Sequence, residues 1–322
     1  MNKFWRGLII GWVGLGLAAL AGETPVDRQG QTLHILTGPA SGIYFPIGYG
    51  FAGFLGGLGY KTQAVPSDGS VENIRNLLAG NGELAIAMAD AVAQARDGSG
   101  AFAGSPPADL VAIMGLWPNV CQIVATEESG IKNFADLKGK TVSVGPAASG
   151  VELNARTIFA AEGMSYSDCH ILHLAYGDAI AAMATGECDA AFVTSGLGND
   201  SIRRLSQLGA GKKTRFIPLT GASLKRLTAK YPYYLPATIA EANAQTITVM
   251  NVLLARRALP DAVVYDLLTN LWSPAGLAAV GKTHAVAQRE ITWENALRGL
   301  ENIPLHPGAI RFYQERGLLP AK

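Results

Sequence analysis

The 322-residue sequence is poor in charged residues and has no excess of basic over acidic side chains. Charged residues make up 16% of the chain, against 49% hydrophobic residues and 38 glycines, which argues against a disordered chain or a coiled coil. Lysine and arginine number 26 and the acidic residues 25, so the chain lacks the basic surplus that binding to phosphates requires. We therefore expect a packed globular protein of one large or two ordinary domains, with no nucleic-acid partner.

Cysteine is also scarce. Only Cys121, Cys169 and Cys188 are present, and an odd number cannot form a complete disulfide framework. At most one disulfide can form, and the spacing of Cys169 and Cys188 ahead of two apolar runs does not show whether they are neighbours. Buried thiols are the expected state, and a single disulfide is the alternative.

The N-terminus has the pattern of a secretory signal peptide. Lys3 and Arg6 precede an uncharged apolar run over 7–20, and Ala19-Leu20-Ala21 supplies the small residues of a cleavage site. We predict a signal peptide over 1–21, removed after Ala21, and export of the remaining chain. The alternative is an uncleaved anchor, for which the run is shorter than the roughly 20 apolar residues of a membrane span.

Strand-like and helix-like segments alternate along the chain from residue 31, which predicts an α/β fold with parallel strands and helical crossovers. The first group of alternating segments, over 33–88, is followed by two further predicted strands, 110–116 and 119–126, the second of which leaves the first sheet. A second group, over 140–208, then repeats the pattern in a second sheet. The segments predicted as strands are 33–37, 60–65, 83–88, 110–116, 119–126, 140–145, 170–175, 189–195 and 246–256. Those predicted as helical are 43–58, 71–78, 151–162, 178–185, 199–208, 260–272, 274–280, 292–300 and 308–316.

The long strand at 246–256 is expected to run back into the first sheet. Two similar lobes joined by two crossing strands then enclose a cleft. We place one lobe at 31–118 and 251–322, and the other at 119–250.

Glycine and small polar residues recur in the loops that follow the predicted strands. Ligands of open parallel sheets bind at these strand ends, where glycine lets the backbone come close and helix N-termini attract anions. The candidate ligand-binding residues are Gly38, Ser41, Gly42, Tyr44, Ser67, Gly69, Ser70, Asn73, Asp90, Ser149, Gly150, Tyr176, Ser195 and Gly196. Helix capping is the alternative for Ser70, Ser149 and Asp178, core packing for the tyrosines, and Asp90 either holds a ligand ammonium group or caps a helix.

Signatures of catalysis are absent from the sequence. The GxGxxG spacing at 48–53 lies inside an apolar helical segment, where helix packing explains it better than dinucleotide binding. His170 and His173 point to opposite faces of a strand, so they do not form a metal pair. We expect no catalytic residue, cofactor or metal, which weakens the alternative of a transferase or synthase with a similar fold.

Six segments carry a family resemblance: LTGPASGIYFPIG (36–48), VPSDGSVENIRNLLAG (65–80), AIAMADA (85–91), FADLKGKTVSVGPAASGVELNAR (134–156), GECDAAFVTSG (186–196) and IPLHPGAIRFYQERG (303–317). In this order they resemble the solute receptors of the TAXI subfamily of TRAP (tripartite ATP-independent periplasmic) transporters. Two positions depart from the family pattern, which often has Thr at Val151 and Pro within 196–199.

The resemblance implies a periplasmic binding protein of the two-lobed, type II-like fold, whose lobes close over a small carboxylate or amino acid. Its ligands resemble glutamate, glutamine, 2-oxoacids or dicarboxylates, and its partner is a membrane permease driven by an ion gradient. The Gly/Ser loops fall where the family binds its ligand. A receptor for an ABC permease or a periplasmic sensor is the alternative, and we expect a monomer.

Closure of the lobes is expected to bend the crossing segments at 116–120 and 246–250. Backbone amides and the hydroxyls of four serines, Ser67, Ser70, Ser149 and Ser195, are expected to hold carboxylate oxygens. Tyr44 and Tyr176 are expected to pack on the ligand.

Overall fold

A computed structural model describes residues 26–197, 201, 204 and 213–320. The predicted signal peptide over 1–21 and most of the predicted helix over 199–208 lie outside the described residues. In this part of the chain, no helix combines the length and the apolar character needed to cross a bilayer.

Three parallel strands begin the sheet: β1 (Thr32–Leu36), β2 (Lys61–Val65) and β3 (Leu84–Met88). Helices α1 (Tyr44–Gly57) and α2 (Ser70–Leu78) connect them, and α3 (Ala89–Asp97) follows β3 directly. Every residue of β3 is buried, as expected for a strand covered on both faces. The predicted alternation of strand and helix is confirmed here.

Two long antiparallel strands form the centre of the sheet, β4 (Val111–Thr126) and β10 (Ala244–Ala255). The prediction of two separate strands at 110–116 and 119–126 is wrong, because β4 continues through Pro118. Proline cannot donate a hydrogen bond to a ladder, and the pairing of β4 with β10 is irregular next to this position, between Met250 and Val252. The strand therefore tolerates proline at a local irregularity.

The remaining strands follow on the far side of β4. Strands β5 (Thr141–Ser143), β6 (His170–Leu172) and β7 (Ala190–Ser195) carry helices α4 (Gly150–Ala161) and α5 (Tyr176–Thr185), while β8 (Thr214–Phe216) pairs with β4 and β9 (Leu235–Ile239) with β10. Helix α7 (Gly221–Lys230) precedes β9. The structure has one ten-stranded sheet of order β2-β1-β3-β10-β4-β7-β5-β6, with β8 and β9 beside it, so the expectation of two separate sheets is corrected.

The C-terminal part is helical, with α8 (Asp261–Leu271), α9 (Pro274–Gly281), α10 (Ala285–Glu290) and α11 (Pro307–Glu315). The predicted helix over 292–300 is wrong, because this segment forms turns that lie against β4. The Gly115 amide donates to the carbonyl of Ala296 at 2.7 Å. A β-carbon at Gly115 would come within 2.2 Å of the Asn295 carbonyl oxygen, so glycine allows this close approach.

Four short 3-10 helices complete the elements: η1 (Gly100–Phe102), η2 (Phe134–Leu137), η3 (Tyr166–Asp168) and η4 (Ala240–Ala242). All three cysteines are free thiols, Cys121 and Cys188 buried and Cys169 partly buried. The disulfide alternative is therefore not realised.

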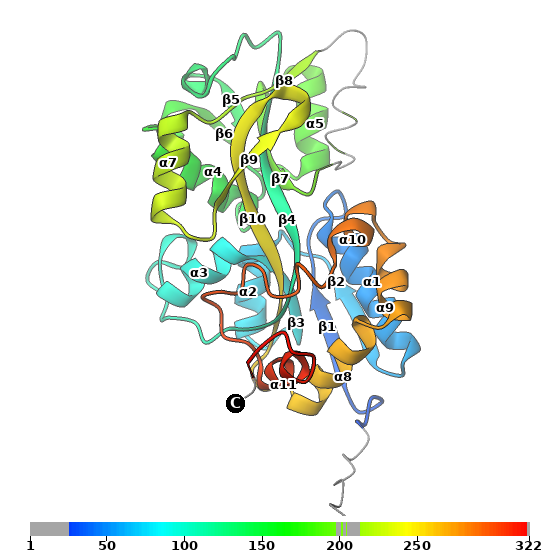
Figure 1. Cartoon of the computed structure of the whole chain (residues 1–322). Helices are drawn as coiled ribbons and strands as arrows, with labels where there is room; N and C mark the ends of the chain where they lie inside the picture. The colour runs from blue at the N-terminus through cyan, green and yellow to red at the C-terminus, as the bar shows by residue number, and fades with distance from the viewer. Residues whose placement is uncertain (1–25, 198–200, 202–203, 205–212, 321–322) are drawn as a thin grey trace, which may run out of the picture.

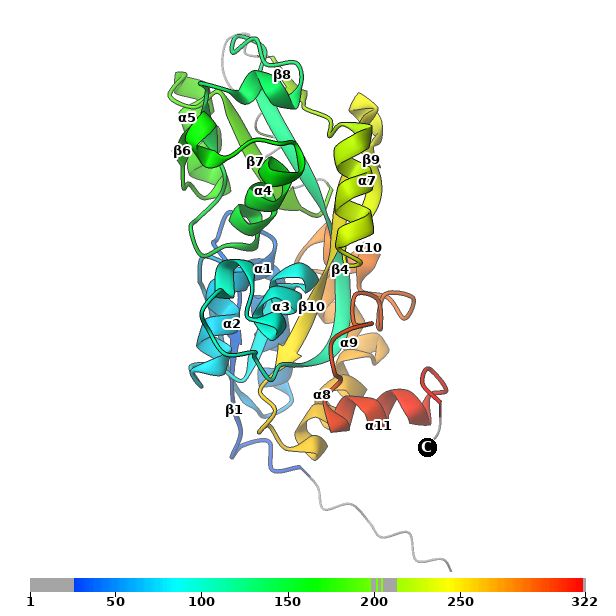
Figure 2. The same ribbon diagram turned by 90° about the vertical axis from the view of Figure 1, so that its left-hand side faces the viewer.

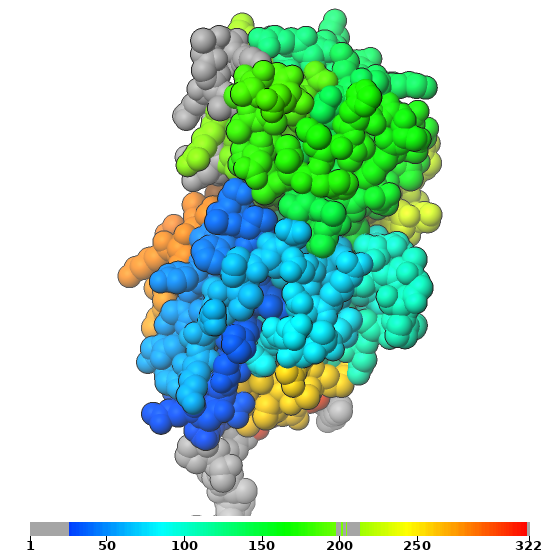
Figure 3. All heavy atoms as spheres, turned by 180° about the vertical axis from the view of Figure 1, so that it is seen from behind, coloured from blue at the N-terminus to red at the C-terminus, as the bar shows by residue number. Residues whose placement is uncertain are grey.

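The molecule has two lobes, through both of which β4 and β10 pass (Figures 1 and 2). Lobe I holds β1–β3, α1–α3 and the C-terminal helices, and lobe II holds β5–β7, α4, α5 and α7 (Figure 1). Seen from behind, the blue loops of lobe I touch the green loops of lobe II along the boundary between the lobes (Figure 3). The residue limits of the lobes and the hinge segments stay predictions.

Candidate functional site

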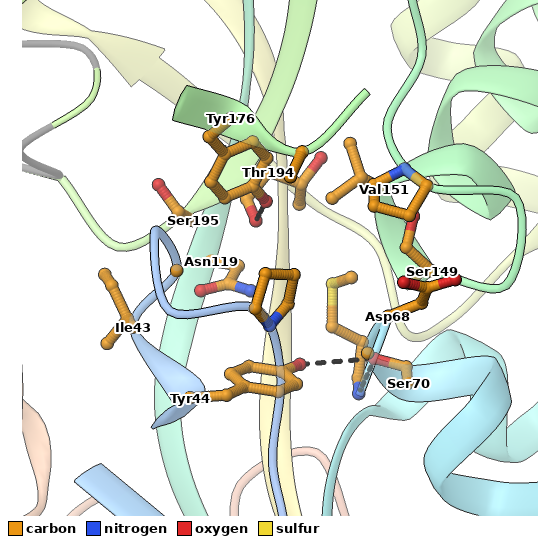
Figure 4. A pocket seen from close by; sticks show the side chains of 17 residues that line it. Ile43, Tyr44, Asp68, Ser70, Asn119, Ser149, Val151, Tyr176, Thr194 and Ser195 are labelled. Carbon is orange, nitrogen blue, oxygen red and sulfur yellow. Dashed lines mark hydrogen bonds between the residues drawn. The ribbon is translucent and has the colours of Figure 1, made fainter. Parts of the chain in front are cut away.

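A cleft lies between the two lobes, where the loops after β1, β2, β5 and β6 meet the end of β7 (Figure 4). It is lined by Pro39, Gly42, Ile43, Tyr44, Asp68, Gly69, Ser70 and Met88 from lobe I, Asn119 from β4, and Pro146, Ser149, Gly150, Val151, Ala175, Tyr176, Thr194 and Ser195 from lobe II. About 490 Å³ of unfilled space lies among these residues, including the opening to solvent.

Helix N-termini from both lobes point at this cleft. Helices α1, α2, α4 and α5 begin at Tyr44, Ser70, Gly150 and Tyr176, and each of these first residues lines the cleft. The unpaired amides of a helix start carry partial positive charge and favour anions. The cleft therefore attracts negative charge through backbone groups.

Local sequence sets the start of two of these helices. Ser149 is the N-cap of α4 and its hydroxyl accepts a hydrogen bond from the Glu152 amide at 3.1 Å. The N-cap of α2 is Gly69, at a φ of 123° that favours glycine, so capping by Ser70 is corrected. Ser70 is the first residue of α2, and its hydroxyl accepts from the Met88 amide at 3.1 Å.

The floor of the cleft in lobe I is a hydrogen-bonded network around Tyr44. The Tyr44 hydroxyl donates to Asn251 Oδ1 at 2.5 Å and lies 3.2 Å from Ser70 Oγ. Asn119 Nδ2 donates to the same Asn251 oxygen at 3.2 Å. Burial raises the pKa of Tyr44 well above its ordinary value, so the phenol stays neutral. Its hydroxyl is held by the protein, and the ring faces the cleft (Figure 4).

The opposite wall belongs to lobe II. The Tyr176 hydroxyl donates to the Thr194 carbonyl at 2.7 Å, and burial raises the pKa of this tyrosine. Thr194 is 2% exposed, and its hydroxyl has no nitrogen or oxygen partner among the described residues. The buried thiol of Cys121 is opposite it on β4 and is its hydrogen-bonding neighbour. The Thr194 hydroxyl is therefore enclosed by protein and does not face the cleft.

Formal charge is almost missing from the cleft. Among the described lining residues, only Asp68 carries one, and its side chain is exposed at the mouth. Partial burial and the nearby Glu72 raise the pKa of Asp68. An anion in the cleft thus meets no cationic side chain in this lining.

The cleft contains eight of the fourteen sequence-predicted residues: Gly42, Tyr44, Gly69, Ser70, Ser149, Gly150, Tyr176 and Ser195. The other six, Gly38, Ser41, Ser67, Asn73, Asp90 and Gly196, are not in its lining. For each of the six, the structure gives a different contact.

Ser67 and Asn73 brace the loop between β2 and α2. The Ser67 hydroxyl lies 2.6 Å from Asn73 Oδ1 and accepts from the Gly69 amide at 3.0 Å. Asn73 is fully buried and donates to the Ile86 carbonyl at 2.8 Å. Both side chains hold the loop in shape, and the prediction that Ser67 Oγ faces the cleft is corrected.

Asp90 lies buried between the lobes, away from the cleft lining. Its Oδ2 accepts from the Tyr234 hydroxyl at 2.7 Å and from Asn154 Nδ2, and Oδ1 accepts from the Ala91 amide at 2.8 Å. Burial raises the pKa of Asp90 to about 6. The carboxylate thus joins α3 of lobe I to α4 of lobe II, and the expectation of a contact with a ligand ammonium is corrected.

Three predicted residues pack at the edges of the cleft. A β-carbon at Gly38 would lie 3.2 Å from that of Tyr44, so this glycine seats the tyrosine. Ser41 lies opposite Gly177 of lobe II, with 3.6 Å between the Ser41 β-carbon and the position a Gly177 β-carbon would take. Gly196 packs against Val286 and Ile43 of lobe I.

The lobes are in contact around the cleft. The Glu72 amide of α2 donates to the Ala148 carbonyl of lobe II at 3.0 Å. A β-carbon at Gly150 would come within 2.2 Å of Met88 Cε and 2.8 Å of Ser70 Oγ. These contacts between lobes define a closed arrangement with little free space in the cleft.

Sequence reasoning missed nine lining residues: Pro39, Ile43, Asp68, Met88, Asn119, Pro146, Val151, Ala175 and Thr194. Asn119 was detectable as a polar amide in the middle of an apolar run, which indicates a buried group that needs hydrogen-bond partners. In the structure it is 3% exposed. The loops that were predicted to bind a ligand contain four of these residues, Pro39, Asp68, Pro146 and Val151. Met88 is the last residue of β3, and Thr194 precedes the predicted Ser195.

Comparisons with known proteins agree on the fold. The model of the NMT1-like family matches residues 35–317. A solved structure from Bordetella bronchiseptica RB50 is 15% identical, with a TM-score of 0.57 over 90% of this chain and 99% of that one. The binding protein component of an ABC phosphonate transporter from Pseudomonas aeruginosa is 13% identical, with a TM-score of 0.52 over 89% and 95%. A structure described as a periplasmic transporter is 16% identical, with a TM-score of 0.51 over 80% and 95%. The fold is that of the two-lobed periplasmic binding proteins, as the sequence predicts.

Proposed function

Because the chain belongs to the NMT1-like family, a family of periplasmic substrate-binding proteins, we propose that it captures a small organic anion between its lobes and delivers it to a membrane permease. The ligand of this proposal is a small carboxylate or amino acid. Glutamate, glutamine, 2-oxoacids and dicarboxylates are the starting classes, because the sequence resembles receptors of those ligands.

One observation carries the proposal: four helix N-termini, two from each lobe, begin at residues that line a single cleft. Oxygen atoms of a carboxylate can accept hydrogen bonds from amides of both lobes at once. The Ser149 and Ser195 hydroxyls add side-chain groups on lobe II. The full set of hydrogen bonds to an anion is therefore available only when the lobes are closed around it.

Closure is the mechanical part of the proposal. The Glu72–Ala148 hydrogen bond and the packing of Gly150 on Met88 join the lobes directly at the cleft. Both contacts break if the lobes separate by bending at 116–120 and 246–250. A ligand that binds the closed form shifts the population toward it by its difference in affinity for the two forms.

A charge variant at Ser149 tests the site without removing the helix cap. Ser149→Asp and Ser149→Asn place side chains of the same shape at the N-cap, and both residues cap helices well. Thermal shift and calorimetry against amino acids, 2-oxoacids and dicarboxylates first identify a ligand, which at 100 times its Kd stabilises the fold by about 2.7 kcal/mol. We expect Ser149→Asp to weaken anion binding at least about tenfold relative to Ser149→Asn, a difference of about 1.4 kcal/mol. Equal affinity of the two variants would contradict an anion at this helix start.

For the partner, we propose a TRAP permease, on the basis of the sequence resemblance. The second candidate is an ABC permease, because one protein of the same fold is a component of an ABC phosphonate transporter. Uptake into proteoliposomes that contain a candidate permease separates the two. A TRAP partner gives uptake driven by an ion gradient without ATP, whereas an ABC partner gives no uptake unless ATP is supplied.

A further inference from the structure

We infer that the ligand has a single carboxylate and a compact apolar side group, and that the cleft discriminates against dicarboxylates. The inference rests on the proposed function, because it names the ligand class of the same cleft. The chemistry of the residues that line the cleft narrows the ligand classes named above.

The first support is the apolar wall. Six lining residues, Pro39, Ile43, Met88, Pro146, Val151 and Ala175, are apolar and come from both lobes. Ile43, Met88 and Val151 are at most 5% exposed. Ile43 and Val151 stand on opposite sides of the cavity in Figure 4, so a ligand between the lobes has apolar neighbours on two sides.

Polar groups lie on both sides of the cleft as well, with Asn119 and Ser195 near Ile43 in Figure 4. Ser149, Asp68 and Ser70 lie together on one side in Figure 4, next to the starts of α4 and α2. One carboxylate fits this side, where helix amides supply the hydrogen-bond donors. The rest of the ligand then faces the apolar wall, where burial of each methylene tightens binding about fourfold.

The second support is the absence of a cationic side chain for a second carboxylate. Among the described lining residues there is no lysine, arginine or histidine, and the single formal charge is the negative one of Asp68. With the first carboxylate at the starts of α2 and α4, a second one has only neutral groups near the starts of α1 and α5 to replace its water, and its approach to Asp68 is unfavourable. The phenols of Tyr44 and Tyr176 offer no free hydroxyl, because Asn251 and the Thr194 carbonyl accept their hydrogens.

Isosteric ligand pairs test the inference by calorimetry on the mature full-length protein. Leucine and aspartate have side chains of nearly the same shape, one apolar and one charged, and 2-hydroxy-4-methylpentanoate and malate repeat the comparison without an ammonium group. We expect the apolar member of any pair that binds to bind at least about tenfold more tightly. Equal or tighter binding of the dicarboxylate overturns the inference but leaves the proposed function standing. Failure of all four compounds to bind overturns the inference, whereas the proposed function is overturned only if the wider screen of amino acids, 2-oxoacids and dicarboxylates also gives no ligand.

A variant at Asp68 tests the source of the discrimination. Its side chain is exposed, so Asp68→Asn is expected to fold normally. Removal of the like charge should raise the affinity for malate about fivefold and leave that for 2-hydroxy-4-methylpentanoate within about twofold. Asp178→Asn is the matched control, because Asp178 is exposed in the first turn of α5 but does not line the cleft. Unchanged malate affinity in Asp68→Asn, or an equal gain in the control, overturns the role of Asp68.

Discussion

Asp90→Asn should change how the stability of the protein depends on pH. Asp90 is fully buried, and its hydrogen-bond donors among the described residues are all neutral: the Tyr234 hydroxyl, the Asn154 amide and the Ala91 amide. Burial raises the pKa from 3.8 to about 6, so the folded protein binds the proton more tightly than the unfolded chain. The associated stability is fully present below about pH 3.8 and is lost as the pH rises through about 6. The whole shift corresponds to about 3 kcal/mol of unfolding free energy.

Between about pH 7.5 and about pH 5.0, linkage gives about 1.4 kcal/mol of this gain. Burial raises the pKa of Tyr44, Cys121 and Tyr234 around Asp90, so these neighbours stay neutral over that range. The variant has no proton to bind, and its new amide can donate to Asn154 Oδ1, which has no partner within the described ranges. Urea unfolding followed by tryptophan fluorescence should show that the unfolding free energy of the wild type, relative to that of the variant, rises by about 1.4 kcal/mol as the pH falls over this range.

The exposed Asp97 at the end of the same helix supplies the control. Asp97→Asn removes one carboxylate from α3 without touching the buried network, so its stability should follow that of the wild type across the pH range. A constant difference between wild type and Asp90→Asn from about pH 7.5 to about pH 5.0 would refute the reasoning, because it would mean that the neutral donors stabilise the carboxylate as well as water does.

Three further substitutions test the cleft and the fold. Thr194→Val removes a buried hydroxyl that has no nitrogen or oxygen partner in the described part of the chain, so the stability measured by urea unfolding should stay within about 1 kcal/mol. Because this hydroxyl is enclosed by protein, calorimetry should show ligand affinity within about twofold of wild type, and a loss of about tenfold would mean that the hydroxyl contacts the ligand. Gly150→Ala places a β-carbon against Met88 Cε and should favour separated lobes, seen as a larger radius of gyration in X-ray scattering and weaker binding; an unchanged radius and affinity would argue against closure at this contact. Gly115→Ala places a β-carbon against the Asn295 carbonyl oxygen and should lower the unfolding free energy by about 2 to 4 kcal/mol, since backbone on both sides resists movement.

The alternation of strand and helix was predictable because each element has its own local pattern. The parallel order of β1, β2 and β3 follows from that pattern, since crossovers of this length suit helices. The continuity of β4 through Pro118 was not predictable. It depends on pairing with β10, more than a hundred residues away, and such pairing leaves no trace in the local sequence.

The turns over 292–300 show the same limit. Their apolar spacing resembles a helix, but their backbone is held against Gly115 of β4, where a regular helix has no free carbonyl to offer.

The candidate loops were predictable from glycine and serine at strand ends. Which side chain in a loop faces the cleft was not, because Ser67 turns inward to Asn73 while Ser149 lines the cavity. Hydrogen-bond partners decide that orientation, and they come from other parts of the chain.

The placement of helix starts explains how one ligand charge closes two lobes. The first residues of α2 and α4, Ser70 and Gly150, meet across the cleft, so two helix ends of like partial charge approach each other. Two first-turn amides have acceptors, because the Glu72 amide donates to the Ala148 carbonyl and the Glu152 amide to the Ser149 hydroxyl. The amides of Ser70 and Gly150 at the two helix starts have no intrahelical acceptor. An anion between the helices turns the repulsion into attraction for both, and a neutral ligand of the same shape does not. Closure should therefore depend on the charge of the ligand more than on its size. A neutral analogue in which a carboxamide replaces the carboxylate of the ligand should bind without drawing the lobes together.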